Sequence, residues 1–224
     1  MDRYIYLLLG ALLSPIWGTI FYCRNDLRKT MIKTSLAGGF AGLIAEYWYF
    51  KDYWRPPTIL SFTIYSIEDF IVGFFLLGIS ISIYSFTFNK IEIKQEKAMK
   101  KFFLFLFLFA LSMMIILQPL GYNSMLISPL IFIIYSIIIV IIRKDLLKKA
   151  IYSGILFLII ILPIYMLLFN FIAPNYWNKY WVISNTKFGT TCLGNIPCME
   201  VLWYFSWGSF GGICHNFYSG TKVV

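Results

Sequence analysis

The chain has 224 residues, of which 60% are hydrophobic and 20% aromatic, and its formal net charge is +9. A soluble domain of this length has too little interior to bury so much apolar surface, so the composition excludes an ordinary soluble protein and indicates an integral membrane protein. Nucleic acid is not expected as a partner, because the basic residues lie in short connectors between apolar runs, as is typical of membrane topology.

Apolar runs long enough to cross a lipid bilayer recur along the chain, and one helical span needs about 20 residues. These runs predict seven transmembrane helices at residues 4–22, 31–50, 64–88, 102–121, 124–142, 150–173 and 196–218. Apolar and polar residues do not alternate, so a β-barrel is not expected. The predicted fold is an all-α integral membrane domain that occupies residues 1–224.

The charges of the connectors predict the orientation in the cell membrane. Fourteen basic residues follow the first, third and fifth predicted helices or lie near the C-terminus. The other side has only five: Arg3, Lys51, Arg55, Lys179 and Lys187. The positive-inside rule therefore places the N-terminus outside and the C-terminus in the cytoplasm.

Four short matches recur in the same order and predict an internal duplication. They are Leu13-Ser14-Pro15-Ile16 with Ile127-Ser128-Pro129-Leu130, Lys33 and Gly38 with Lys149 and Gly154, Tyr53-Trp54 with Tyr180-Trp181, and Glu68-Asp69 with Glu200. Helix 102–121 then serves as a linker. Residues 1–88 and 124–218 become two parallel three-helix repeats about an axis along the membrane normal.

Aromatic and small residues cluster near the predicted outer face and along the second helix. The aromatic residues are Tyr47, Trp48, Tyr49, Tyr53, Trp54, Tyr176, Trp177, Tyr180 and Trp181. They fit either an interfacial belt or a lid over a buried pocket. The small residues are Ala37, Gly38, Ala41, Gly42 and Ala45, and their spacing predicts close helix packing.

Few acidic residues lie within the predicted spans. Glu46 is near the outer end of the second helix, Glu68 and Asp69 are one turn into the third, and Glu200 is one turn into the seventh. In one interpretation Glu68, Asp69 and Glu200 cap their helices and pair with outer basic residues. In the other they converge between the repeats in a dry pocket, where burial and repulsion keep one acid protonated.

Other chemistries find less support in the sequence. His215 is the one histidine, so a histidine cluster for a metal ion is excluded. An all-carboxylate metal site stays open without a pattern that supports it, and neither a metal nor a cofactor is expected. Helix 196–218 contains no lysine, which excludes a retinal Schiff base there. Cys192 and Cys198 lie near one outer loop, where they either pair as a disulfide or stay reduced.

At its acids the chain resembles the membrane-embedded lycopene cyclase domain family, of the heterodimeric or fused type. Members of that family look like duplicated three-helix units, each with a Pro-x-Glu-Glu/Asp motif at the start of a helix. Pro197 and Glu200 match the second copy, with methionine in place of the first acid. Glu68 and Asp69 match the first copy, with Ser66 in place of the proline.

This resemblance implies acid-catalysed ring closure of a linear carotenoid or a related lipid-soluble polyprenoid, an isomerisation without a cofactor. It implies that Glu68, Asp69 and Glu200 supply the acid and the base, and burial alone adds Glu46 as a further candidate. Candidates for lining the substrate cavity, or else ordinary packing residues, are Phe70, Phe74, Trp203 and Tyr204.

Two other classes of function stay open. One is a small transporter with the same three-plus-one-plus-three layout, and the other is a non-catalytic lipid-binding or scaffold subunit of a homo- or hetero-oligomer. A polar path across both leaflets favours the transporter, whereas an apolar slot with acids at one end favours the cyclase. Helices 102–121 and 124–142 carry almost no polar side chains, which favours the slot.

Overall fold

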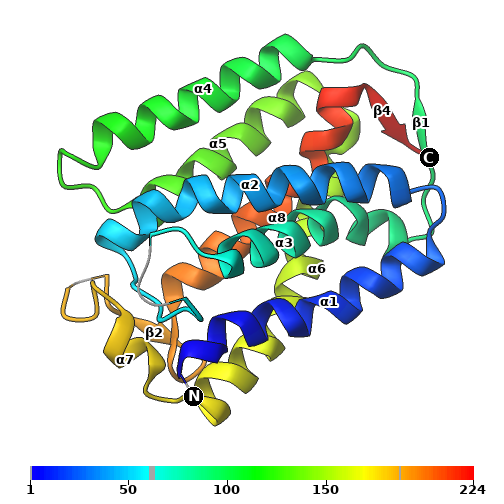
Figure 1. Cartoon of the computed structure of the whole chain (residues 1–224). Helices are drawn as coiled ribbons and strands as arrows, with labels where there is room; N and C mark the ends of the chain where they lie inside the picture. The colour runs from blue at the N-terminus through cyan, green and yellow to red at the C-terminus, as the bar shows by residue number, and fades with distance from the viewer. Residues whose placement is uncertain (1, 61–63, 187) are drawn as a thin grey trace.

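The computed structural model describes residues 2–60, 64–186 and 188–224. Within them, seven long helices follow one another at the places that the apolar runs predict (Figure 1). They are α1 (Ile5–Cys23), α2 (Arg28–Asp52), α3 (Ile67–Thr87), α4 (Lys100–Leu117), α5 (Ser124–Ile142), α6 (Leu147–Met166) and α8 (Cys198–Ser219). A π-helical turn, Leu167–Ile172, extends α6.

The connectors and the two ends of the chain contain short elements. They are two 3-10 turns (Asp2–Tyr4 and Lys144–Leu146), helix α7 (Tyr176–Tyr180), and strands β1 (Glu92–Lys94), β2 (Thr191–Cys192), β3 (Ile196–Pro197) and β4 (Thr221–Val223). The strands form two antiparallel pairs, β1 with β4 and β2 with β3.

Local side-chain hydrogen bonds explain where α3 and α5 begin. The Ser66 hydroxyl accepts the Asp69 backbone N–H at 3.2 Å, and Asp69 Oδ2 accepts the Ser66 backbone N–H at 2.8 Å. This reciprocal pair is a capping box, which satisfies backbone donors at a helix start. At α5, Asn123 Oδ1 accepts the Met125 N–H at 2.9 Å, so each helix begins at a residue that suits an N-cap.

The connectors after α1 and α5 use the same ion pair. Arg24 forms a two-pronged pair with Asp26, and Arg143 forms one with Asp145, each with an Nη2–Oδ2 distance of 2.7 Å. Bidentate arginine–carboxylate pairs are the strongest and most directional of ion pairs. The hydrogen bond from Arg24 lowers the pKa of the Asp26 carboxyl, so the turn keeps its ion pair at neutral pH.

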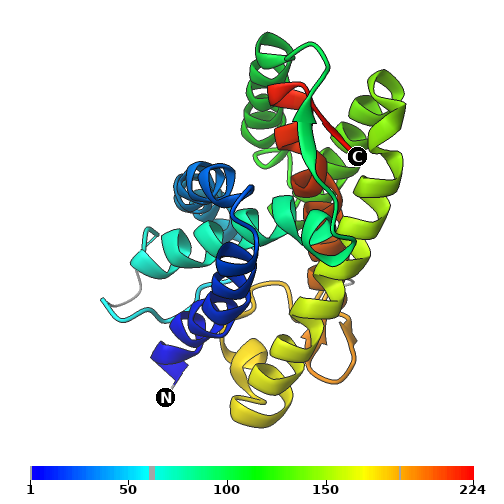
Figure 2. The same cartoon turned by 90° about the vertical axis from the view of Figure 1, so that its right-hand side faces the viewer.

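Helices α3 and α8 form the centre of the bundle. α3 packs against α1 and α2, α8 packs against α5 and α6, and α3 and α8 contact each other. Figure 2 shows α1 to α3 on one side and α4, α5, α6 and α8 on the other. Helix α4 lies at the edge, against α5 and α8 (Figure 1).

Small residues let α2 approach α3 closely. A Cβ added at Gly42 would collide with the Asp69 carbonyl oxygen and lie 3.5 Å from the Cα of Gly73. One added at Gly38 would collide with the Gly73 carbonyl oxygen. The close packing predicted for this stripe is confirmed, and it brings Glu46, one turn after Gly42, to the side of α3 that carries Asp69.

At the end of the bundle near the N-terminus, the two halves of the chain are joined through backbone hydrogen bonds. Trp54 and Trp181 form an isolated antiparallel bridge. The Arg55 N–H donates to the Tyr180 carbonyl at 2.9 Å, and the N–H of residue 182 donates to the carbonyl of residue 53 at 2.8 Å. This bridge joins the connector after α2 to the one after α7.

At the opposite end, β4 ties the C-terminus to the connector between α3 and α4 (Figure 1). Glu92, which is opposite Val223 in this pair of strands, forms a buried ion pair with Lys149 at 2.5 Å and accepts a hydrogen bond from Asn216 at 2.9 Å. Burial alone would raise the pKa of the Glu92 carboxyl, but the charge and hydrogen bond of Lys149 outweigh it and the pKa is lowered.

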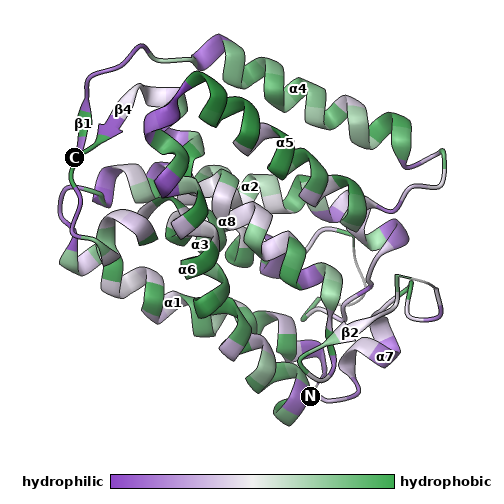
Figure 3. Cartoon of the chain, turned by 180° about the vertical axis from the view of Figure 1, so that it is seen from behind, coloured by the Kyte–Doolittle hydropathy of each residue, from purple (hydrophilic) through white to green (hydrophobic). Residues whose placement is uncertain are grey.

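Within the described residues, five segments are long and apolar enough to cross a membrane: Asp2–Cys23, Ile67–Thr87, Lys100–Leu117, Ser124–Ile142 and Lys144–Ile172. In Figure 3 the hydrophobic colouring dominates α4 and α5, and hydrophilic residues gather at the end near the C-terminus. Helices α2 and α8 are as long but contain more polar and glycine residues. The architecture is therefore that of an all-α membrane protein, while seven spans and the two repeats stay predictions.

Candidate functional site

A cavity of about 590 Å³ lies among α2, α3, α4, α5 and α8. Most of its lining is apolar, and its acidic lining residues are Glu46, Asp69 and Glu200. Along α8 the lining runs from Glu200 to Cys214, fourteen positions further along the helix, which is about 21 Å at the rise of an α-helix. The cavity is thus an elongated apolar slot with its acids near one end.

Glu200, in the first turn of α8, is held by tyrosines from both halves of the chain. The Tyr53 hydroxyl donates to Oε1 at 2.7 Å and the Tyr165 hydroxyl donates to Oε2 at 3.1 Å. The hydroxyls of Tyr165 and Tyr204 are 2.5 Å apart. A buried carboxyl needs such donors, and here each of its oxygens has one.

Asp69 occupies the same position in α3 as Glu200 does in α8, the third residue of the helix. Its Oδ2 accepts the backbone N–H and the hydroxyl of Ser66, at 2.8 and 2.9 Å. The Tyr6 hydroxyl also interacts with this carboxyl. Part of the Asp69 side chain is therefore committed to starting the helix.

Glu46 projects into the same end of the cavity from α2, with 4% of its surface exposed. Its Oε2 accepts the indole N–H of Trp54 at 3.3 Å, and its Oε1 has no hydrogen-bond partner among the described residues. Both Asp69 and Glu200 interact with it electrostatically. The described lining contains no lysine or arginine, so nothing in it neutralises these three acids.

Glu68 is fully buried but does not line the cavity in the described part of the chain. Its Oε1 accepts the backbone N–H of Ile59 at 2.8 Å, which attaches the connector to the start of α3. The structure therefore brings together Glu46, Asp69 and Glu200 and separates Glu68 from them.

Two of the four aromatic candidates, Trp203 and Tyr204, line the cavity, whereas Phe70 and Phe74 are not among its described lining residues. Phe74 packs against Trp17 of α1 with ring centroids 5.5 Å apart, and Phe70 packs against Phe74 at 6.4 Å. These two phenylalanines thus fill the space between α3 and its neighbours.

An aromatic wall continues from the acids along α8 and α5. Trp203 and Trp207 stack with centroids 5.5 Å apart, and the Phe132 ring lies 5.1 Å from Trp207. The Trp203 indole N–H donates to the Tyr49 hydroxyl at 2.8 Å, which orients it. Electron-rich ring faces beside a cavity stabilise a cation.

Most of the aromatic residues predicted as a belt or a lid are buried. Tyr53, Trp54, Trp177 and Trp181 lie inside the protein, and Trp54 stacks on Trp177 at 5.6 Å. Tyr47, in contrast, is partly exposed. Of the buried members, Tyr53 and Trp54 hydrogen-bond the acids Glu200 and Glu46; a role of the cluster as a belt or as a lid stays a prediction.

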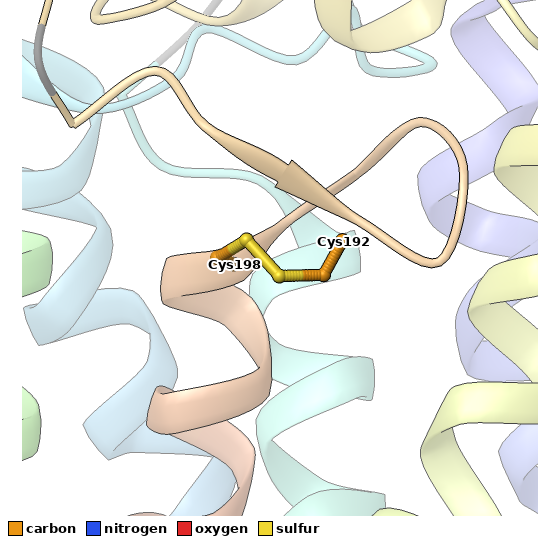
Figure 4. Close-up of a disulfide and its surroundings, with 2 residues drawn as sticks. All are labelled: Cys192 and Cys198. Carbon is orange, nitrogen blue, oxygen red and sulfur yellow. A yellow bond between two sulfur atoms is a disulfide. The ribbon is translucent and has the colours of Figure 1, made fainter.

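A disulfide fixes the start of the helix that carries Glu200. Cys192 of β2 pairs with Cys198, the first residue of α8 (Figure 4). The pairing that the sequence left open is therefore present. In the described residues, no group of three or more His, Cys, Asp or Glu side chains is arranged to hold a metal ion.

Fold and site together define a helical membrane protein with a buried, acid-lined apolar slot. Residues 122–218 match the model of a family described as lycopene cyclase, which confirms the resemblance noted at Pro197 and Glu200; Glu68 and Asp69 lie outside the matched range. The matched range contains α5, α6 and nearly all of α8, with Tyr165 and Glu200. No curated protein and no solved structure matches the chain.

Several residues of the site were not singled out from the sequence. Tyr6 and Tyr165 lie within continuous apolar runs, and Tyr53 was assigned to the aromatic cluster and to an internal match but not to the site. Tyrosine in such a run carries a signal, because a buried hydroxyl needs a hydrogen-bond partner. In this protein those partners are the acids Asp69 and Glu200.

Proposed function

We propose that the protein is a membrane-embedded acid/base cyclase, an isomerase that acts on a linear carotenoid or a related polyprenoid. The observation that carries the proposal is an apolar slot with Glu46, Asp69 and Glu200 near one end, in a chain with a lycopene cyclase family segment.

Ring closure needs what these residues offer. A carboxylic acid adds its proton to the terminal double bond of the substrate, and the next double bond attacks the resulting cation to close the ring. A carboxylate then removes a proton from a ring carbon, so the product is an isomer of the substrate and no electrons are gained or lost. A dry cavity keeps water from the cation, and the Trp203 and Trp207 rings beside it stabilise the charge.

The walls of the slot fit a substrate that arrives from the lipid. Phe40 and Ile44 of α2 and Phe107 of α4 line the cavity and are also exposed at the surface of the bundle. A transported polar solute would instead need polar groups along its path, whereas the lining away from the acids is apolar. These features support sideways entry between α2 and α4.

We also propose that residues 1–88 and 124–218 are duplicated three-helix units joined by α4. The two Arg-x-Asp pairs support this, because Arg24 donates to the Lys90 carbonyl at 2.5 Å and Arg143 donates to the Thr221 carbonyl at 3.0 Å. Glu200 follows Asp69 by 131 residues, and Thr221 follows Lys90 by the same 131 residues, so the two arginines bind equivalent carbonyls.

The paired strands support the same duplication. Val223 also follows Glu92 by 131 residues, which makes these two residues equivalent in the proposed duplication. They are direct partners in the pair of strands β1 and β4. When two equivalent segments meet on a two-fold axis, they pair with each other through equivalent residues. The bridge between Trp54 and Trp181, which the sequence matched as equivalents, lies at the other end of the bundle, as expected for an axis along the membrane normal.

For the orientation, we propose that the acid end faces outwards. The basic connectors lie at the opposite end, and the disulfide lies at the acid end, which suits an oxidising exterior. With Cys23 replaced by serine, an impermeant thiol reagent applied to intact cells should label a cysteine at Asn185 but not one at Lys97. The reverse labelling would refute this orientation.

The cyclase function is tested by expressing the chain in bacteria that accumulate lycopene and separating the extracted carotenoids by chromatography. We expect cyclised end groups with the wild-type chain and none with Glu200→Gln. Unchanged lycopene and unchanged shorter linear carotenoids, with the wild-type protein present in the membrane, would refute the function.

A further inference from the structure

We infer that Glu46 donates the proton that starts ring closure and that Glu200 accepts the proton that ends it. This assignment rests on the proposed cyclase function and goes beyond it by giving the acids different roles. The argument depends on which carboxyl oxygens are already occupied by the protein.

Glu200 is built to be an acceptor. An ionised carboxylate has only acceptor positions, and a tyrosine hydroxyl can donate to it. Tyr53 and Tyr165 place one donor on each oxygen of Glu200. Hydrogen bonds of this kind are strongest when the acceptor is charged, so the two tyrosines hold Glu200 as the carboxylate that a base must be.

Glu46 is in the opposite situation. One of its oxygens has a single donor, Trp54, and the other has no partner among the described residues. An ionised Glu46 would face Asp69 and Glu200 without a compensating cation in the described lining, which is costly in a buried site. A protonated Glu46 avoids that cost and leaves its O–H free for a double bond in the cavity.

Asp69 also has an oxygen, Oδ1, with no hydrogen-bond partner among the described residues. It is less suited to either role, however, because its Oδ2 is engaged by two hydrogen bonds from Ser66 in the capping box. Movement of this carboxyl towards a substrate would release the first turn of α3. Asp69 therefore remains as a fixed charge that favours the protonated form of Glu46.

Two adjacent residues hold the donor and the acceptor. Tyr53 donates to Glu200 and Trp54 donates to Glu46, and Trp54 is itself anchored by its backbone bridge to Trp181. The spacing between the two acids is thus set by one rigid dipeptide. After each turnover the proton on Glu200 returns to its electrostatic neighbour Glu46, which restores both groups with no net proton change.

The activity test compares Glu46→Gln with Glu46→Asp and Glu68→Gln in lycopene-accumulating cells and in purified protein. General acid catalysis contributes about 100- to 10,000-fold, so Glu46→Gln should lose at least about 100-fold in turnover. Glu46→Asp, which keeps a proton but moves it, should retain more than Glu46→Gln. Glu68→Gln keeps an acceptor for the Ile59 N–H and should stay near wild type.

A second readout does not depend on turnover. The infrared spectrum of the purified protein in lipid at neutral pH should contain the C=O band of a buried protonated carboxyl that shifts in heavy water. That band should vanish in Glu46→Gln and persist in Glu200→Gln. Its persistence in Glu46→Gln, or wild-type turnover by that variant, would overturn the assignment. A wild-type protein with the band but without turnover would instead refute the cyclase function itself.

Discussion

Replacing Tyr53 by phenylalanine removes the shorter of the two hydrogen bonds to Glu200, with an O–O distance of 2.7 Å. The ring remains, so the change deletes one donor and leaves the packing against Trp177 in place. A hydrogen bond to a charged group contributes about 1.5–3 kcal/mol. If that energy holds Glu200 as the base, its loss lowers turnover by about 10- to 150-fold.

The assay is the initial rate of cyclised carotenoid formation by purified protein, measured by chromatography. Tyr176→Phe is the matched control, because Tyr176 is also buried but its hydroxyl has no hydrogen-bond partner in the described part of the chain. We expect Tyr176→Phe to keep the wild-type rate. If Tyr53→Phe were also within about twofold of wild type, the hydrogen bond would not hold the base and the reasoning would be refuted.

Three further predictions concern stability and packing. Lys149→Met leaves the Glu92 carboxylate buried without its partner and should lower the free energy of unfolding by about 3–5 kcal/mol, and adding Glu92→Gln should restore most of it. The folded-state pKa of Glu92 is lowered, so the loss of unfolding free energy in Lys149→Met should be full at neutral pH. It should shrink as the pH falls through that pKa and Glu92 becomes protonated. Thermal unfolding at a series of pH values measures this. Gly42→Val should separate α2 from α3 and reduce turnover at least about tenfold. Gly18→Ala should keep the wild-type turnover, because a Cβ there meets no atom within 4 Å. Equal turnover of the two variants would contradict the close approach of α2 to α3. Cys198→Ser should lower the unfolding free energy by about 2 kcal/mol through loss of a short closed loop, and a reductant should then destabilise the wild type but not the variant.

Most of the helices were predictable because they are long apolar runs, and α5 occupies the predicted residues 124–142. The bounds of α2 are wider than predicted, Arg28–Asp52 instead of 31–50, because a helix can continue through charged residues that are solvated at its ends. Strands β1 and β4 were not predicted. Each is three residues long, and their pairing depends on a contact between distant parts of the chain.

The acids show where sequence reasoning reaches its limit. Neighbouring residues on a helix project about 100° apart, so Glu68 and Asp69 cannot both face one cavity, and the motif does not say which of them does. Asp69 lines the cavity and Glu68 binds the connector. Glu46 was noted from its burial in a predicted span, and the structure places it beside Asp69 and Glu200.

The internal matches were also of unequal value. Pro15 lies past the middle of α1, but Pro129 lies in the first third of α5, so the Ser-Pro match does not align these two helices of equal length. The Arg-x-Asp pairs at 24–26 and 143–145 do align their ends. The Arg-x-Asp match is present in the sequence, but it lies in basic connectors, where the charge alone already accounts for the arginines through membrane topology.

The bundle is clamped at both ends and open along one flank. The bridge between Trp54 and Trp181 closes one end, β1 and β4 close the other, and Phe40 and Phe107 mark the flank between α2 and α4. Because the helices are tied together at both ends, they cannot move apart to admit a thicker substrate. The width of the slot therefore limits which molecules can bind. We expect the slot to favour a straight molecule that lies lengthwise over the same molecule with a bend in its chain.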